Sequence, residues 1–187
     1  MPPVSSDETL RTLRRAREGD RSAREVLLAR IRPRVVLWCA ARMSPALRSK
    51  LEPEDLAQEI LLGVHGRLDE FDGDSAAVFY GWVFRIAENR IRDAADHFGA
   101  LRRRPVEQRP RDVTTPSEIA VRGEIVGRVR DAVLRLGEDH REVVRMHLLE
   151  GREVADVAQV MGRTPGAVRV LYCRALRALR EEVPELG

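Results

Sequence analysis

The sequence predicts an all-α protein built from two small helical domains, and three observations support this class. Apolar residues recur at three- and four-residue spacing, as in Leu56, Ile60 and Val64, which is the period of an amphipathic helix. Aromatic residues make up only 4% of the 187 residues and charged residues make up 34%, a balance that disfavours a β-sandwich. Glycine and proline separate the periodic segments, where helices are expected to end.

Helical patterns occupy residues 8–18, 22–43, 54–68, 76–97, 117–136, 138–149, 154–161 and 165–182. Pro33 falls inside the second segment and predicts a kink or a break, because proline lacks the amide hydrogen that a helix interior needs. Ser75 or Asp74 is expected to cap the helix that follows the loop 71–75.

The apolar period is lost between residues 99 and 116, which contain three prolines and five arginines. This composition is typical of a linker, here a basic and flexible one. We therefore expect one domain at residues 1–100, a linker at 101–117 and a second domain at 118–187.

Composition excludes several classes of protein. The net charge is +3, and Lys50 is the single lysine among 33 basic residues, so arginine content alone is weak support for nucleic-acid binding. Cys39 and Cys173 are far apart and form no CxxC pair, which argues against a disulfide framework or a zinc site. We see no signal peptide and no apolar stretch near the ~20 residues of a membrane span. A cytoplasmic protein without membrane insertion or cofactor is expected.

The segment from Val154 to Glu182 has the outline of a helix-turn-helix. A short apolar-periodic run ends at Gly162, and Thr164 and Pro165 can cap and begin a second helix. The apolar face of that second helix is expected to comprise Val168, Leu171, Tyr172, Ala175 and Leu179. No acidic residue occurs between Arg163 and Arg180, so the opposite face suits DNA phosphates. The alternative is an ordinary solvated helix in a bundle.

The predicted helix 54–68 and its flanks are rich in acid. The carboxylates are Glu52, Glu54, Asp55, Glu59, Asp69, Glu70, Asp72 and Asp74. Acids in the first turn stabilise the positive end of a helix, but that role does not explain their density. Such a surface should repel DNA and attract a basic protein partner.

The predicted helix 76–97 carries a possible base-binding face. Trp82, Arg85, Asn89 and Arg92 follow at spacings of three, four and three, which places them on one side. An aromatic ring beside Arg and Asn suits stacking on exposed bases and hydrogen bonding to them. A core tryptophan beside a solvated polar face explains the same pattern equally well.

Two blocks of the chain resemble the sigma factors of bacterial RNA polymerase. DLAQE with the W-x-x-R-I-A-x-N-R pattern, within Asp55 to Pro105, is similar to conserved region two, and Arg141 to Glu182 is similar to region four. Their order and the short linker between them resemble the extracytoplasmic-function (ECF) group. The resemblance implies a factor that binds core polymerase and directs promoter recognition, melting and initiation.

The resemblance also implies which residues meet each partner. Asp55, Gln58 and Glu59, with Glu54 beside them, would dock on the clamp helices of the polymerase largest subunit; the flap region is a further expected contact. The minus-ten element would meet Phe71, Asp72, Gly73, Ser75, Trp82, Arg85, Asn89 and Arg92. The minus-thirty-five element would meet Arg163, Thr164, Ala167, Arg169, Val170, Arg174 and Arg177.

Two other functions were weighed. A stand-alone helix-turn-helix regulator with an N-terminal helical sensor domain would bind DNA unaided, but it leaves the acidic helix unexplained. An enzyme is disfavoured because His65, His97, His140 and His147 show no metal-binding spacing and no glycine-rich phosphate loop occurs. The sequence leaves open whether an anti-sigma protein holds the factor inactive.

Overall fold

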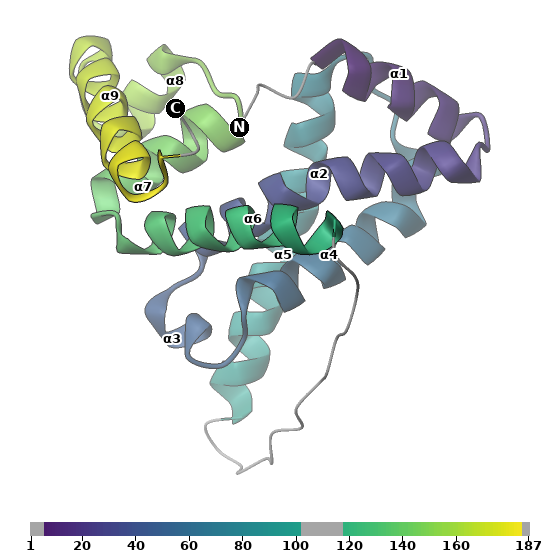
Figure 1. The fold of residues 1–187 in the computed structure, drawn as a ribbon, viewed down its shortest axis with the longest axis horizontal. Coiled ribbons are helices and arrows are strands. Elements are labelled where there is room, and N and C mark those ends of the chain that lie inside the picture. The colour runs from purple at the N-terminus through teal and green to yellow at the C-terminus, as the bar shows by residue number, and fades with distance from the viewer. Residues whose placement is uncertain (1–5, 102–117, 185–187) are drawn as a thin grey trace.

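The computed structural model describes residues 6–101 and 118–184, and these residues form helices joined by short turns, with no strand among them (Figure 1). The predicted all-α class is therefore confirmed. The linker expected at 101–117 lies, apart from Leu101, outside the described residues. The elements are α1 Ser6–Arg17, α2 Arg21–Arg42, α3 Pro45–Arg48, α4 Pro53–Arg67, η1 Leu68–Glu70, α5 Ala76–Leu101, α6 Glu118–Arg135, α7 Glu138–Val143, η2 Val144–Leu149, α8 Val154–Met161 and α9 Pro165–Glu182.

Helix α2 is the central element of the N-terminal half and packs against α1, α4 and α5. Ten of its side chains are buried, Ile31, Val35 and Trp38 among them. The expected break at Pro33 does not occur, because α2 continues through it. An interior proline costs about 3 kcal/mol, and the buried face of α2 offsets that cost.

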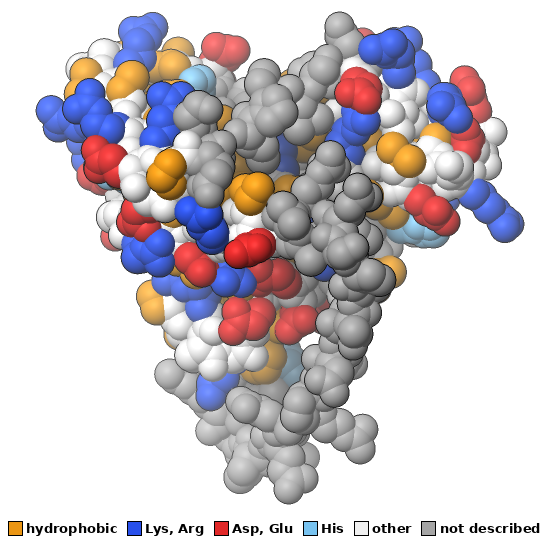
Figure 2. Space-filling view, in the orientation of Figure 1, with side chains coloured by type: hydrophobic (Ala, Val, Ile, Leu, Met, Phe, Trp, Pro, Cys, Tyr) orange, Lys and Arg blue, Asp and Glu red, His pale blue; other side chains and the backbone are white. Residues whose placement is uncertain are grey.

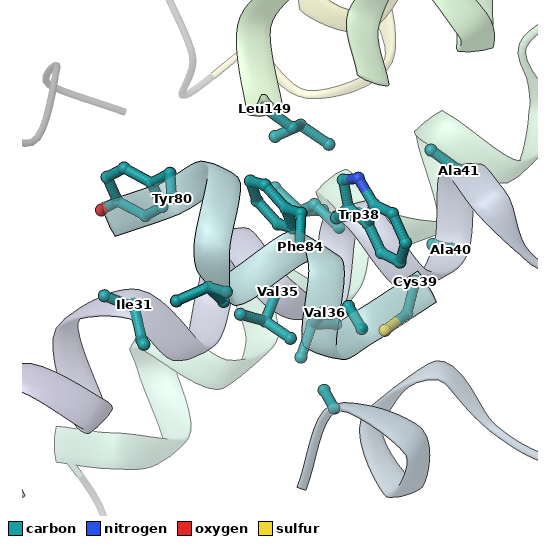
Figure 3. Packing of buried hydrophobic residues seen from close by; sticks show 14 of the residues in the cluster. Ile31, Val35, Val36, Trp38, Cys39, Ala40, Ala41, Tyr80, Phe84 and Leu149 are labelled. Atoms are coloured by element: carbon teal, nitrogen blue, oxygen red, sulfur yellow. The ribbon is translucent and has the colours of Figure 1, made fainter. Parts of the chain in front are cut away.

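Two aromatic groups complete this core. The rings of Trp38 and Phe84 stack with centroids 5.2 Å apart, and Phe71 meets Phe79 edge-on at 5.4 Å. Cys39 is fully buried on the same helix as Trp38, as expected of a small core residue. Figure 3 shows how closely Leu149, from the C-terminal half, lies to Trp38 and Phe84. The apolar cluster is thus continuous between the two halves.

The C-terminal half is a helical layer against one side of α2. Helix α6 runs beside α2, while α7, α8 and α9 pack on one another and on the end of α6 (Figure 1). Between α7 and α8 the chain forms a π-helix, η2, in which the amide of Glu150 donates to the carbonyl of Arg145 at 2.9 Å. The sequence period did not predict this widened turn.

Candidate functional site

Helix α4 presents the acidic face that the sequence predicted. Pro53 occupies its first turn, and Leu56 and Ile60 bury its inner side. Asp55, Gln58 and Glu59 are all exposed on the opposite side. Figure 2 shows acidic side chains gathered near the middle of the molecule, where Figure 1 places α4 and α6. These carboxylates are free to meet a basic surface.

Glu54 differs from its neighbours because it already has a basic partner. Nη1 of Arg130, on α6, donates to Oε1 of Glu54 at 2.6 Å, and the same guanidinium bonds Asp131. Burial disfavours the charged guanidinium, but the hydrogen bond to Asp131 and the charge of Glu54 outweigh it and raise the pKa of Arg130. One corner of the acidic face is therefore covered by the C-terminal half.

The loop before α5 is held by an aromatic anchor and a capping hydroxyl. Phe71 is 4% exposed and lies between Phe79 and Trp82, with a centroid distance of 5.2 Å to Trp82. Ser75 accepts a hydrogen bond from the amide of Val78 at 3.2 Å, so the predicted cap of α5 is confirmed. Phe71 is consequently a packing residue in this structure, whereas Asp72 is exposed.

A hollow opens beside this loop, with a volume of about 390 Å³. Phe71, Asp72, Trp82 and Arg85 line it together with Glu70, Val78 and Gly81. Trp82 is half-buried: its indole packs against the core and also borders the hollow. Both interpretations of Trp82 thus describe part of its environment. Asn89 and Arg92 are exposed further along α5 and do not line the hollow.

A second hollow of about 500 Å³ lies on the other side of the same loop. Arg14 and Arg17 of α1 line it with Asp72, Gly73 and Val78, and Arg17 approaches Asp72 at 3.5 Å. The sequence gave no reason to place α1 here. The two arginines lie more than 50 residues from the loop along the chain, and only the folded arrangement brings them to it.

The helix-turn-helix has the local geometry that the sequence predicted. Gly162 adopts a left-handed conformation with φ 63°, which glycine tolerates best. The amide of Ala167 donates to Oγ1 of Thr164 at 3.2 Å, so Thr164 caps α9, and Pro165 follows in the first turn. Val168, Ala175 and Leu179 are buried, with Leu171 and Tyr172 partly buried beside them. The predicted apolar face of α9 is therefore confirmed.

The opposite side of α9 is basic and open. Thr164, Ala167, Arg169, Val170, Arg174 and Arg177 are all exposed. Basic side chains gather over the α9 end of the molecule in Figure 2. Arg163, in the turn, is also exposed but forms an ion pair with Asp139 of α7 at 2.5 Å. The structure thus holds Arg163 through α7 and leaves the other arginines facing solvent.

Other site types find no support in the described part of the chain. No group of three or more His, Cys, Asp or Glu side chains there could hold a metal ion. Among the same residues, no helix combines the length and apolar character that a membrane span requires.

Two family models match the chain. Residues 27–104 match "Sigma-70 region 2", and residues 127–179 match "Sigma-70, region 4". The ECF RNA polymerase sigma factor SigD of Mycobacterium tuberculosis is 32% identical over 172 residues, which cover 90% of this chain and 81% of SigD. The chain belongs to the ECF RNA polymerase sigma factors. The ECF factor ShbA of Streptomyces griseus is likewise 32% identical, over 89% of this chain and 90% of ShbA.

Membership confirms the resemblance carried by the two motif blocks. As an ECF sigma factor, the protein directs RNA polymerase to promoters for transcription initiation and is not itself an enzyme. A solved structure, that of CnrH in complex with the cytosolic domain of CnrY, covers 95% of this chain at 24% identity, with a TM-score of 0.45.

Proposed function

We propose that this ECF sigma factor docks on core polymerase through the exposed face of α4, formed by Asp55, Gln58 and Glu59. The observation that carries the proposal is the pair Asp55 and Glu59. They lie one helical turn apart, and both side chains face solvent. Adjacent carboxylates on a rigid helix attract a basic partner and are disfavoured beside DNA. Glu54, at the corner of this face, would join the contact.

The partner of this face is proposed to be the clamp helices of the largest polymerase subunit, with the flap region contacting the C-terminal half. Polymerase would then fix the separation of two weak DNA modules. Holding both modules on one assembly makes the second DNA contact effectively intramolecular, so neither module needs high affinity alone. An anti-sigma protein and a cytoplasmic location remain predictions from the sequence.

The hollow beside Trp82 and Arg85 is proposed to receive bases of the melted minus-ten element. An aromatic edge and a guanidinium at one opening can stack on a base and hydrogen-bond to it. Asn89 and Arg92 would extend the contact along the strand, and Asp72, Gly73 and Ser75 would shape the loop. Trapping unstacked bases offsets the few kcal/mol that unstacking costs.

Helix α9 is proposed to lie in the major groove of the minus-thirty-five element. Its N-terminal part would read base edges through Thr164, Ala167, Arg169, Val170 and Arg174. Arg163 and Arg177 would approach the phosphates on either side. The free factor is accordingly expected to bind duplex promoter DNA poorly.

The docking proposal is tested with Asp55→Arg combined with Glu59→Arg. Pull-down of core polymerase should be lost while the helical circular-dichroism signal is retained. Glu25→Arg, an exposed charge reversal on α2, is the matched control and should leave the pull-down unchanged. Unaltered binding by the double variant would place the docking surface elsewhere.

The DNA proposals need the assembled holoenzyme. Arg85→Ala should weaken binding to a single-stranded minus-ten oligonucleotide, whereas Arg169→Ala should weaken use of a duplex minus-thirty-five element. A base-reading contact is worth about 1–3 kcal/mol, and a phosphate contact lowers the salt dependence instead. Tight, sequence-specific binding of promoter duplex by the factor without polymerase would favour a stand-alone regulator.

A further inference from the structure

The two halves of this factor are joined by a specific contact surface, which we call the latch and define by Arg34, Trp38, Glu54, Arg130, Leu149 and Glu150. We propose that the latch keeps the free factor closed and that polymerase and promoter DNA engage an opened form. The proposal rests on the function proposed above and adds a form of regulation to it.

The latch combines apolar burial with directional polar contacts. Leu149 is 2% exposed and lies over Trp38 and Phe84 (Figure 3). Nε of Arg34 donates to the carbonyl of Leu149 at 2.6 Å, and its guanidinium lies 3.6 Å from the ring centroid of Tyr80. The same guanidinium thus fastens η2 to α2 while resting on an aromatic face of α5.

Two further polar contacts cross between the halves at separate places. Nε1 of Trp38 donates to Oε1 of Glu150 at 2.8 Å. Arg130 reaches Glu54 at 2.6 Å, on the first turn of α4. Contacts at the end of η2, at α2 and at the start of α4 fix both position and rotation of the C-terminal half. Such a surface selects one arrangement and is more than a chance touch of two tethered bodies.

The closed arrangement is too short for a promoter. The minus-ten and minus-thirty-five elements lie about 25 base pairs apart by their names, hence roughly 85 Å at 3.4 Å per base pair. A compact chain of 187 residues has a radius of gyration of about 16 Å, and so a width near 40 Å. The hollow beside Trp82 and the face of α9 therefore cannot reach both elements until the halves separate.

The covalent connection permits that separation. Residues 102–117 join the halves, and a segment of that length can span at most roughly 55 Å when fully extended. Separation would also free Glu54, because Arg130 occupies it in the closed arrangement. A basic surface of polymerase would then compete with Arg130 for the same carboxylate, so docking and opening favour each other.

The latch has a thermodynamic consequence. If only a fraction of the free factor is open, the apparent Kd for core polymerase exceeds the intrinsic Kd by the inverse of that fraction. Weakening the latch should therefore tighten polymerase binding, although none of the altered residues touches polymerase. A merely structural contact would give the opposite result or none.

Opening can be measured without polymerase or DNA, because Trp38 lies in the latch. In a Trp82→Phe background Trp38 is the single tryptophan, and its 1% exposure predicts blue-shifted emission that acrylamide quenches poorly. Adding Arg34→Ala and Arg130→Glu should shift the emission to the red, increase quenching and enlarge the Stokes radius. Arg32→Ala, an exposed arginine on the same helix, should change none of these.

The regulatory claim is tested with Trp82 intact. Arg34→Ala with Arg130→Glu should lower the apparent Kd for core polymerase by roughly three- to tenfold. Adding Glu54→Arg to Arg130→Glu should restore the closed Stokes radius by exchanging the two charges. If the double variant loses its helical circular-dichroism signal, Arg130→Glu alone carries both measurements, since Arg130 lies at the edge of the surface.

Three results would overturn the proposal. They are a solvent-exposed Trp38 in the Trp82→Phe protein, latch variants that do not open, and variants that open without binding polymerase more tightly. A failure of the docking proposal differs from all three, because it would appear as unaltered pull-down by the Asp55 and Glu59 variant while Trp38 still reports a closed factor.

Discussion

The indole nitrogen of Trp38 donates a 2.8 Å hydrogen bond to Glu150, which lies 112 residues further along the chain. Glu150 also pairs with Arg145 and Arg152, and its side chain is only 8% exposed. Arg145 in turn pairs with Glu142. A buried indole N–H needs an acceptor, and a buried carboxylate needs cations. The network therefore satisfies groups from both halves at once.

Removing the charge at the centre of this network should be costly. Glu150→Gln keeps an acceptor for Trp38 but leaves the guanidinium of Arg145, whose side chain is 10% exposed, with Glu142 alone. Breaking a buried pair typically costs about 3 kcal/mol, and we expect a loss of that order in urea unfolding. Glu138→Gln, on exposed Glu138 of α7, is the control. A loss below about 1 kcal/mol would mean that Arg145 is adequately held by Glu142.

Acid should weaken the same region through Glu142. A hydrogen bond from Arg145 lowers the pKa of Glu142 below its ordinary value, although partial burial opposes the shift. A carboxylate with a lowered folded-state pKa contributes its full stability above the unfolded value, about 4.3, and loses it as the pH falls through the folded value. Urea unfolding between pH 6 and pH 3 should therefore depend less steeply on pH in Glu142→Gln. An unchanged slope would assign acid sensitivity to other carboxylates.

Local features of the fold were predictable from the sequence because their causes are local. The cap of Thr164, the left-handed Gly162 and the apolar face of α9 follow from residues within two turns of each other. Pro33 was misread because its penalty is local, whereas the burial of Ile31 and Val35 that outweighs it depends on α1 and α4. The exposure of Asp55 and Glu59 followed from helical period in the same way.

Relationships between the halves were not predictable. Arg130 could pair with any nearby acid, and nothing in spacing selects Glu54, 76 residues away. The π-turn of η2 that brings Glu150 beside Arg145 has no period of its own. Trp82 supported two interpretations because one residue can pack on a core and border a hollow. Each of these depends on how rigid elements are oriented, which a single sequence does not encode in its spacing.

The cap of α9 should have a measurable stability. Thr164→Ala removes the acceptor for the amide of Ala167, and loss of such a cap costs about 1 kcal/mol. Thr164→Ser retains a hydroxyl and should recover most of that loss in thermal unfolding. Equal stabilities for the Ala and Ser variants would show that the hydroxyl does not cap the helix in solution.

The two thiols should react at very different rates. Cys173 is exposed on α9, while Cys39 is fully buried. Burial, together with the charge of Glu54, raises the pKa of the Cys39 thiol, so little thiolate forms at neutral pH. A thiol reagent should modify one cysteine quickly in the native factor and the second only in denaturant. Cys173→Ser should abolish the fast phase; a remaining fast phase would show that Cys39 is accessible.

The loop beside the Trp82 hollow should not tolerate a methyl group at Gly73. A Cβ there would lie 2.3 Å from Cζ of Phe71 and 2.8 Å from Cγ1 of Val78. Phe71 cannot easily yield, because its ring is enclosed by Phe79 and Trp82. Overpacking of this kind costs about 1–3 kcal/mol, and displacing Phe71 would also reshape the hollow.

Gly73→Ala should therefore lower both the free energy of unfolding and promoter melting by the holoenzyme, the latter followed by permanganate reactivity of unpaired thymines. Gly66→Ala is the matched control, since a Cβ at Gly66 meets nothing within 4 Å and alanine favours a helix over glycine. It should leave melting unchanged. Normal melting by a destabilised Gly73→Ala factor would separate the stability of the loop from the minus-ten contact, and would remove the hollow as the proposed site for bases.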